Sequence, residues 1–156
     1  MVSINTSTVI SMPVQEVFEY VANFENAPQW QAGVVKSHKA TDGKIRVGTR
    51  FDEEVRIVAW KAKTVCMITG LDAGKSFTFA LTSGPVDCQG TFTFEHTAVG
   101  TLVSIRATAE MKGIWKLLTP LFSMDAKGGA RKELVRMKKA LESRAAPSSS
   151  RLKAQA

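Results

Sequence analysis

The sequence predicts an α+β domain. A curved, seven-stranded antiparallel sheet wraps around a long C-terminal helix, with two short helices after the first strand. Two periodicities predict it. Apolar residues recur at every second position over much of residues 33–110, the period of strands with one buried face. They recur at steps of three or four over residues 113–143, the period of an amphipathic helix. Such a long helix cannot bury its apolar side alone, so a broad sheet must cover it.

The composition is that of one globular domain. The chain has 156 residues, 44% of them hydrophobic and 22% charged, which is enough for a core and a cavity. No run approaches the ~18 apolar residues of a membrane span. The N-terminal residues lack the pattern of a signal peptide, so we expect a cytoplasmic protein. Residues 1–143 are the expected domain, and residues 144–156 are expected to be a disordered basic tail.

The net charge of +7 is concentrated near the C-terminus. Residues 1–112 contain eleven Lys or Arg and eleven Asp or Glu, whereas residues 113–156 contain ten and three. This basic side of the last helix is either an ordinary solvated face or a surface attracted to an anionic membrane. Nucleic acid is disfavoured as a partner, because no aromatic residues alternate with the basic ones to stack on bases.

The first strand and the two short helices occupy residues 3–30. Residues 3–10 alternate apolar with small polar side chains, as a strand does. Pro13 suits the first position of a helix, because it has no N–H to leave unpaired. Helical spacing follows in Val14, Val17, Phe18 and Val21. Asn23 is suited to cap a second short helix before Trp30.

Six further strands are expected to form consecutive hairpins. They lie at about 33–41, 48–58, 61–71, 75–82, 86–96 and 101–110, separated by turns such as Asp42-Gly43 and Ser83-Gly84-Pro85. Alternation assigns one apolar face to the inside of the sheet. The apolar and small residues expected to point inward are Phe51, Val55, Ile57, Ala62, Thr64, Cys66, Ile68, Phe77, Phe79, Leu81, Val86, Cys88, Phe92, Phe94, Val103, Ile105, Ala107 and Ala109.

The last helix has an apolar stripe and two irregularities. The stripe comprises Leu118, Phe122, Ala126, Ala130, Leu134, Met137 and Leu141. Thr119-Pro120 either kinks the helix or marks its true start. Gly128-Gly129 either bends or breaks it, or leaves room for a ligand beneath.

Several motifs have a recognisable arrangement: Ile10-x-x-Pro13-x-x-x-Val17-Phe18, Asn23-Phe24-Glu25-Asn26-x-Pro28-x-Trp30, Val47-Gly48-Thr49-Arg50-Phe51, Gly84-Pro85, Gly100-Thr101 and Leu134-x-x-Met137-Lys138-x-x-Leu141-Glu142. With the order of the elements, residues 2–143 resemble the START-like superfamily, also called SRPBCC or the helix-grip fold. The branch they resemble most is polyketide cyclase/dehydrase and lipid transport. These are packing and turn positions, so the resemblance concerns the fold more than the chemistry. It implies a deep apolar cavity between sheet and helix for a hydrophobic small molecule; some members catalyse cyclisation or dehydration.

The candidate ligand-binding residues lie on the expected inner surface: Phe51, Glu53, Val55, Thr64, Cys66, Phe77, Phe79, Leu81, Phe92, Phe94, Ile105, Leu118, Leu121, Phe122 and Asp125. The four phenylalanines of the later strands are core filling, cavity wall or both. Glu53 and Asp125 are the weak catalytic candidates, because a carboxyl buried among apolar groups has a raised pKa and can act as an acid, a base or a ligand anchor. Alternatively, Glu53 lies at the sheet edge beside a cation and Asp125 faces water.

The sequence contains no pattern for a metal or cofactor site. Cys66 and Cys88 lack ligand spacing, and their strands are separated by a third, too far for a disulfide. His38 and His96 have no catalytic partner nearby in sequence and are expected at the surface. No phosphate-binding glycine loop is present. We therefore expect no cofactor and no metal.

Three functions are compatible with this sequence. The first is a non-catalytic carrier or sensor of a hydrophobic small molecule (a lipid, polyketide-like or isoprenoid compound). The second is a cyclase or dehydratase that uses an inward carboxylate as acid or base. The third is an interaction protein that docks on an anionic membrane through the basic helix. Trp115 is a candidate for the cavity mouth, or for a buried contact in a homodimer, so the chain is either a monomer or a homodimer.

Overall fold

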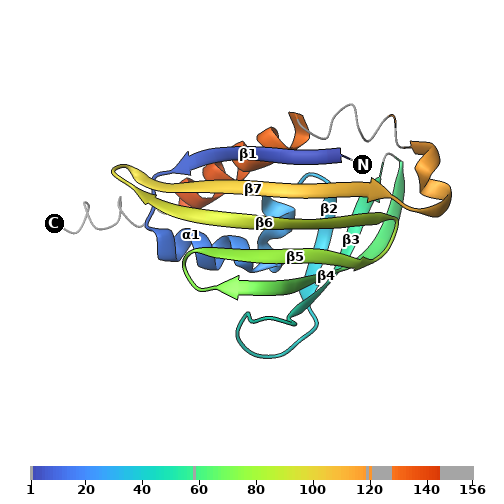
Figure 1. Ribbon diagram of the computed structural model, residues 1–156, viewed down its shortest axis with the longest axis horizontal. Coiled ribbons are helices and arrows are strands. Elements are labelled where there is room, and N and C mark those ends of the chain that lie inside the picture. Colours follow the sequence, from blue (N-terminus) through green and yellow to red (C-terminus); the bar gives the residue numbers. More distant parts are fainter. Residues whose placement is uncertain (1, 58, 119, 121–127, 145–156) are drawn as a thin grey trace.

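The sheet of the protein has seven antiparallel strands, as predicted (Figure 1). The computed structural model describes residues 2–57, 59–118, 120 and 128–144. The strand order is β1-β7-β6-β5-β4-β3-β2. Every strand lies within two residues of its expected bounds: β1 (Val2–Ile10), β2 (Val34–Lys39), β3 (Arg50–Ile57), β4 (Trp60–Asp72), β5 (Ser76–Ser83), β6 (Val86–Thr97) and β7 (Gly100–Met111).

Two short helices connect β1 to β2. The first, α1 (Val14–Ala22), begins directly after Pro13, and η1, a 3₁₀-helix over Phe24–Gln29, follows after Asn23. The Asn23 side chain accepts a hydrogen bond from the Glu25 N–H at 3.2 Å, which is the predicted cap. The Tyr20 hydroxyl donates to Gln29 Oε1 at 2.6 Å and so joins the two helices.

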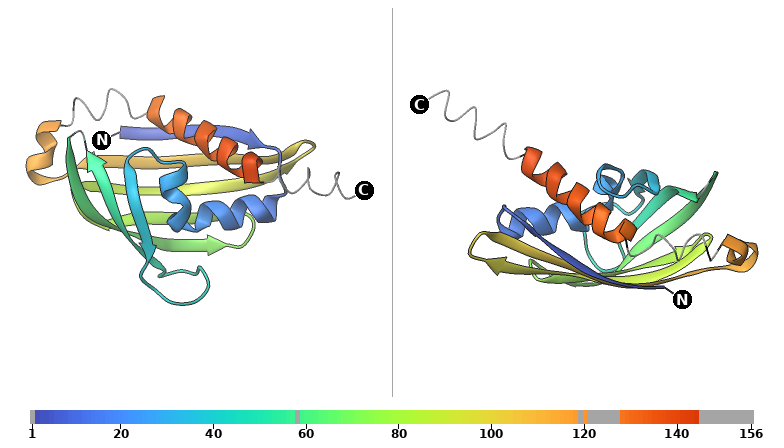
Figure 2. Two further views of the ribbon diagram at one scale, coloured as in Figure 1. Left: turned by 180° about the vertical axis from the view of Figure 1, so that it is seen from behind. Right: turned by 90° about the horizontal axis from the view of Figure 1, so that it is seen from above.

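The C-terminal helix, described over residues 128–144, lies on the same side of the sheet as α1 and η1 (Figure 2). Its buried residues are the last four of the predicted stripe, Ala130, Leu134, Met137 and Leu141. Near its end, Glu142 Oε1 accepts a hydrogen bond from the Ser11 N–H at 3.1 Å. The Arg144 guanidinium lies 5.2 Å from the centroid of the Tyr20 ring. These contacts fix the end of the helix to the connection between β1 and α1.

The start of the last helix differs from the expectation. Gly113–Leu118 forms a separate 3₁₀-helix, η2, in place of the first turns of one long α-helix. Pro120 accounts for the difference, because an α-helix through it would lose one hydrogen bond and bring its ring against the carbonyl of residue 116. Continuity through Thr119-Pro120 lies outside the described residues. Gly128 and Gly129 are both helical and are the first described residues of the C-terminal helix; whether the helix continues before Gly128 lies outside the described residues.

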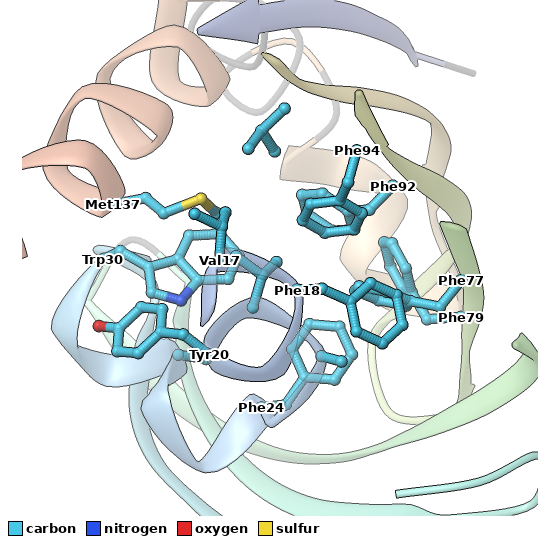
Figure 3. Packing of buried hydrophobic residues seen from close by; sticks show 14 of the residues in the cluster. Val17, Phe18, Tyr20, Phe24, Trp30, Phe77, Phe79, Phe92, Phe94 and Met137 are labelled. Carbon is cyan, nitrogen blue, oxygen red and sulfur yellow. The ribbon is translucent and has the colours of Figure 1, made fainter. Parts of the chain in front are cut away.

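The core lies between the concave face of the sheet and the helices, and aromatic rings dominate it (Figure 3). Phe77 and Phe92 stack with their ring centroids 5.1 Å apart, and Phe18 of α1 meets Phe94 edge-on at 5.2 Å. Trp30 is 1% exposed and packs edge-on against Phe92, so it anchors the end of η1 on the sheet. Met137 of the C-terminal helix reaches the same cluster.

Gly100 begins β7 where that strand lies closest to the end of β1. Its φ is 149°, and a Cβ at this position would collide with the carbonyl oxygen of Ile10. Only glycine combines this backbone conformation with such a close approach. The Thr101 hydroxyl next to it donates to the Met12 carbonyl at 2.8 Å, which holds β7 against the connection to α1.

Candidate functional site

A cavity of about 250 Å³ lies between the sheet and the C-terminal helix. Its walls come from all seven strands, η1 and the residues between η1 and β2, with Ala130 and Glu133 contributed by the helix. Most of the lining is apolar, and several positions carry small side chains. The apolar lining residues are Ile4, Phe24, Val34, Val55, Ile57, Phe79, Leu81, Pro85, Val86, Ile105, Ala107, Ala109 and Ala130.

The structure brings about half of the predicted ligand-binding residues together around this cavity. Those that line it are Glu53, Val55, Thr64, Cys66, Phe79, Leu81 and Ile105. Phe51, Phe77, Phe92 and Phe94 belong to the buried core and do not line it. Leu121, Phe122, Asp125 and the side chain of Leu118 lie outside the part of the chain that the structure describes.

Glu53 points into the cavity from the middle of β3, with only 7% of its surface exposed. Its cross-strand neighbours are Ser37 on β2 and Thr64 on β4, so it does not lie at the sheet edge. The atom Oε2 is buried and has no hydrogen-bond partner among the described residues. Burial raises the pKa of Glu53 to about 7, and the Ser37 hydroxyl opposes this to a smaller extent. Glu53 is therefore an inward acid, as its alternation with Phe51 and Val55 predicts.

Thr64 is the second polar group of the predicted site. Its hydroxyl donates to the carbonyl oxygen of Ser83, beside the turn at Gly84. A Cβ at Gly84, whose φ is 102°, would lie 2.8 Å from Thr64 Oγ1, so glycine is needed for this arrangement. Because the Thr64 proton is already used, only the lone pairs of the hydroxyl remain for a ligand.

Glu133 is a second acid in the cavity, and the sequence analysis missed it. It lies on the helix three residues after Ala130 and four before Met137, at the flank of the apolar stripe. Burial raises the pKa of Glu133 to about 7, and the nearby Arg136 charge opposes this to a smaller extent. An acid at helical spacing from two buried stripe residues is the signal that identifies it.

Cys66 and Cys88 both line the cavity and both are free, as predicted. Burial raises the pKa of both thiols, in the case of Cys88 to about 11. The nearby Glu53 carboxyl further raises the pKa of Cys66. Neither sulfur is an ionised nucleophile at neutral pH, so both act as small apolar lining groups.

Positive charge is scarce around the cavity. Among the described lining residues Arg56 is the one basic side chain, and it is exposed to solvent. His38 lies on the surface, with Nδ1 3.8 Å from Glu25 Oε2, and His96 is also exposed. Within the described part of the chain, no group of three or more His, Cys, Asp or Glu residues is arranged to hold a metal ion.

The region around η2 exposes apolar side chains beside basic ones. Ile114 and Leu117 are 78% and 81% exposed. Trp115 does not line the cavity; its ring lies edge-on to that of Trp60, with the centroids 6.4 Å apart. None of the helices described here is long and apolar enough to cross a membrane.

Solved structures of other proteins share this fold at low sequence identity. A protein from Thermus thermophilus, TTHA0849, matches with a TM-score of 0.73 and 16% identity, over 88% of this chain and 94% of that one. A START superfamily protein from Mycobacterium smegmatis matches with a TM-score of 0.68 and 16% identity, over 91% and 95%. The di-domain ARO/CYC protein StfQ from the steffimycin biosynthetic pathway matches with a TM-score of 0.61 and 14% identity, over 90% of this chain and 52% of StfQ. No curated protein matches the chain in sequence.

The sequence itself matches a family whose description agrees with the fold and the cavity. The match to "Polyketide cyclase / dehydrase and lipid transport" extends over residues 1–142, nearly all of the described chain. The seven-stranded sheet, the two short helices after β1 and the C-terminal helix are the elements of the helix-grip fold. The chain therefore belongs to the polyketide cyclase/dehydrase and lipid transport family of the START-like, or SRPBCC, superfamily.

Proposed function

We propose that the protein binds a lipid, polyketide-like or isoprenoid compound in the cavity between sheet and helix, as a non-catalytic carrier or sensor. Family membership implies a hydrophobic ligand. The observation that carries the proposal is the apolar cavity of about 250 Å³. Affinity comes mainly from apolar surface removed from water, at ~25 cal/mol per Å². The proposed ligand-binding residues are those that line the cavity, Glu53 and Phe79 among them.

The chemistry of the lining favours binding over catalysis. Its two thiols are protonated at neutral pH because burial raises the pKa of each. The described lining contains no histidine and no lysine. A nucleophilic mechanism therefore has no activated group in this part of the site.

A cyclase or dehydratase is the second candidate, and one observation favours it. Glu53 and Glu133 both have a pKa raised by burial to about 7, which suits a group that donates and accepts protons near neutral pH. In this case Glu53→Gln would abolish turnover of a polyketide-like substrate without unfolding the protein. Full activity in that variant would remove Glu53 from the mechanism.

The carrier proposal is tested with a neutral fluorescent dye, N-phenyl-1-naphthylamine, and a variant that fills the cavity. Val55 lines the cavity from β3, so Val55→Trp should reduce dye affinity at least about tenfold. Val65→Trp is the matched control, because Val65 lies on the opposite face of β4 and does not line the cavity. Equal dye binding by both folded variants would contradict the proposal.

A peripheral contact with an anionic membrane is proposed for the basic side of the last helix. Arg131, Lys132, Arg136 and Lys139 are all exposed there. The exposed Leu117 of η2 supplies an apolar group able to enter the headgroup region. Vesicles containing phosphatidylglycerol should bind the protein at low salt and release it at about 0.3 M salt. Absence of binding at low salt would refute this contact.

The cytoplasmic location and the choice between monomer and homodimer stay predictions.

A further inference from the structure

The cavity combines apolar walls with two acids that come from opposite sides. Glu53 projects from β3 of the sheet, and Glu133 from the C-terminal helix that covers it. Glu53 is more than nine-tenths buried, and its Oε2 has no hydrogen-bond partner among the described residues. Arg56, the one basic lining residue in the described part, is exposed. Among the described lining residues, Glu53 thus has no buried cation beside it, and the Ser37 hydroxyl is the side-chain donor that its carboxyl meets.

This imbalance restricts the chemistry of a ligand. A buried acceptor without a donor costs about 1–3 kcal/mol, and more when it is charged. A ligand that carries a carboxylate or phosphate would bring a second negative charge beside the ionised Glu53. A ligand that carries an ammonium group supplies both the missing donors and the missing positive charge.

We propose that the ligand is an apolar molecule with a protonated amine, and that its ammonium group binds to the carboxylate of Glu53. This inference rests on the proposed function, because it specifies the ligand of the same cavity.

The groups around Glu53 determine how binding depends on pH. Ser37 on β2 and Thr64 on β4 are uncharged neighbours, and burial keeps the Cys66 and Cys88 thiols protonated by raising the pKa of each. Glu133 on the helix and Arg56 at the rim are the remaining charged neighbours along the described lining. The pKa of Glu53 is about 7, so below neutral pH this carboxyl is protonated and the ammonium loses its counter-charge. Amine affinity should fall as the pH falls from 8 to 5, whereas affinity for a neutral ligand should not.

The test compares three probes with the same chain length: octylamine, 1-octanol and octanoate. Titration calorimetry at pH 8 should show octylamine binding roughly 10- to 100-fold more tightly than 1-octanol, with octanoate weakest. At pH 5 this preference should shrink several-fold. Glu53→Gln should abolish the preference while 1-octanol still binds. Glu54→Gln is the control, because Glu54 points to the other face of β3 and does not line the cavity.

The possible results separate this inference from the proposed function. Binding of 1-octanol at least as tightly as octylamine to the wild-type protein would overturn the inference and leave the apolar cavity intact as a site. A preference for octylamine that persists in Glu53→Gln would also overturn it. If no probe binds or displaces the neutral dye, the proposed function fails as well. Circular dichroism of each variant verifies that it is folded.

Discussion

Replacing Glu53 with Gln should make the stability of the protein less dependent on pH. The carboxyl is 7% exposed, and burial raises its pKa from 4.5 to about 7. The folded protein therefore holds this proton more tightly than the unfolded chain. The stabilisation from the protonated acid is fully present below about pH 4.5, and it is lost as the pH rises through about 7.

The size of the effect follows from these two pKa values. Between pH 5 and pH 8, ionisation of this one carboxyl should lower the free energy of unfolding of the wild-type protein by about 2.5 kcal/mol. Gln has nearly the shape of the protonated acid and cannot ionise, so the variant lacks this contribution. Glu133, whose pKa burial also raises to about 7, contributes to both proteins and cancels in their difference.

Urea denaturation at pH 5, 6, 7 and 8 measures this difference directly. The free energy of unfolding of Glu53→Gln, relative to the wild-type protein, should rise by about 2.5 kcal/mol across the range. Glu54→Gln is the control, because it makes the same chemical change on the opposite face of β3. Parallel pH curves for the wild type and Glu53→Gln would refute the claim that Glu53 is held in an apolar site.

Three further substitutions test the packing of the fold. Gly100→Ala should lower the melting temperature markedly, because its Cβ would collide with the Ile10 carbonyl oxygen; an unchanged value would show that β1 and β7 separate easily. Phe92→Ala should cost about 3–5 kcal/mol in urea denaturation, since this ring is fully buried and stacks on Phe77; a loss below ~1 kcal/mol would contradict that packing. Gly129→Ala should stabilise the protein by up to ~1 kcal/mol, because the position is helical and no described heavy atom lies within 4 Å of an added Cβ; destabilisation would indicate that the glycine is needed for space.

Local patterns made most of the fold predictable. The alternation of Phe51 and Val55 with charged residues predicts both a strand and its inner face, because side chains on a strand have a period of two. Asn23 predicts a helix cap because its short side chain reaches a nearby N–H. The motifs that resemble those of the START-like superfamily then predict the order of the strands and helices. At the start of the last helix the sequence leaves two alternatives, because the apolar spacing of residues 113–118 favours one continuous helix whereas Pro120 favours a start there. The structure has a separate 3₁₀-helix, η2, over Gly113–Leu118.

The cavity was harder to predict than the sheet, because the pattern of one strand does not show what packs above it. Phe77, Phe79 and Phe92 all point inward, and only Phe79 lines the cavity. Phe18 of α1 packs against Phe77, and Trp30 at the end of η1 packs against Phe92. Glu133 is hard to predict for a related reason: the helical period predicts the apolar stripe but does not show which acid at its flank the sheet covers.

The inner face of the sheet is therefore divided into a filled part and a hollow part. Where α1 packs, the rings of β5 and β6 interlock and supply stability. Where the helix passes over Ala107 and Ala109, the side chains are small, and Ala130 on the helix is small as well. Because these alanine side chains are small, the cavity remains between the sheet and the C-terminal helix at this place.

The two buried acids face this hollow part, where they weaken the protein at neutral pH. A ligand that supplies donors and positive charge would remove that cost on binding, so stability and ligand affinity should be coupled through the same carboxyl. Glu53→Gln should then be more stable than the wild-type protein without a ligand, and should gain less stability from octylamine at pH 8. If Glu53→Gln is more stable than the wild-type protein but gains as much stability from octylamine as the wild type does, the cost of burying Glu53 is not relieved by the ligand. That result would show that Glu53 does not bind the ligand.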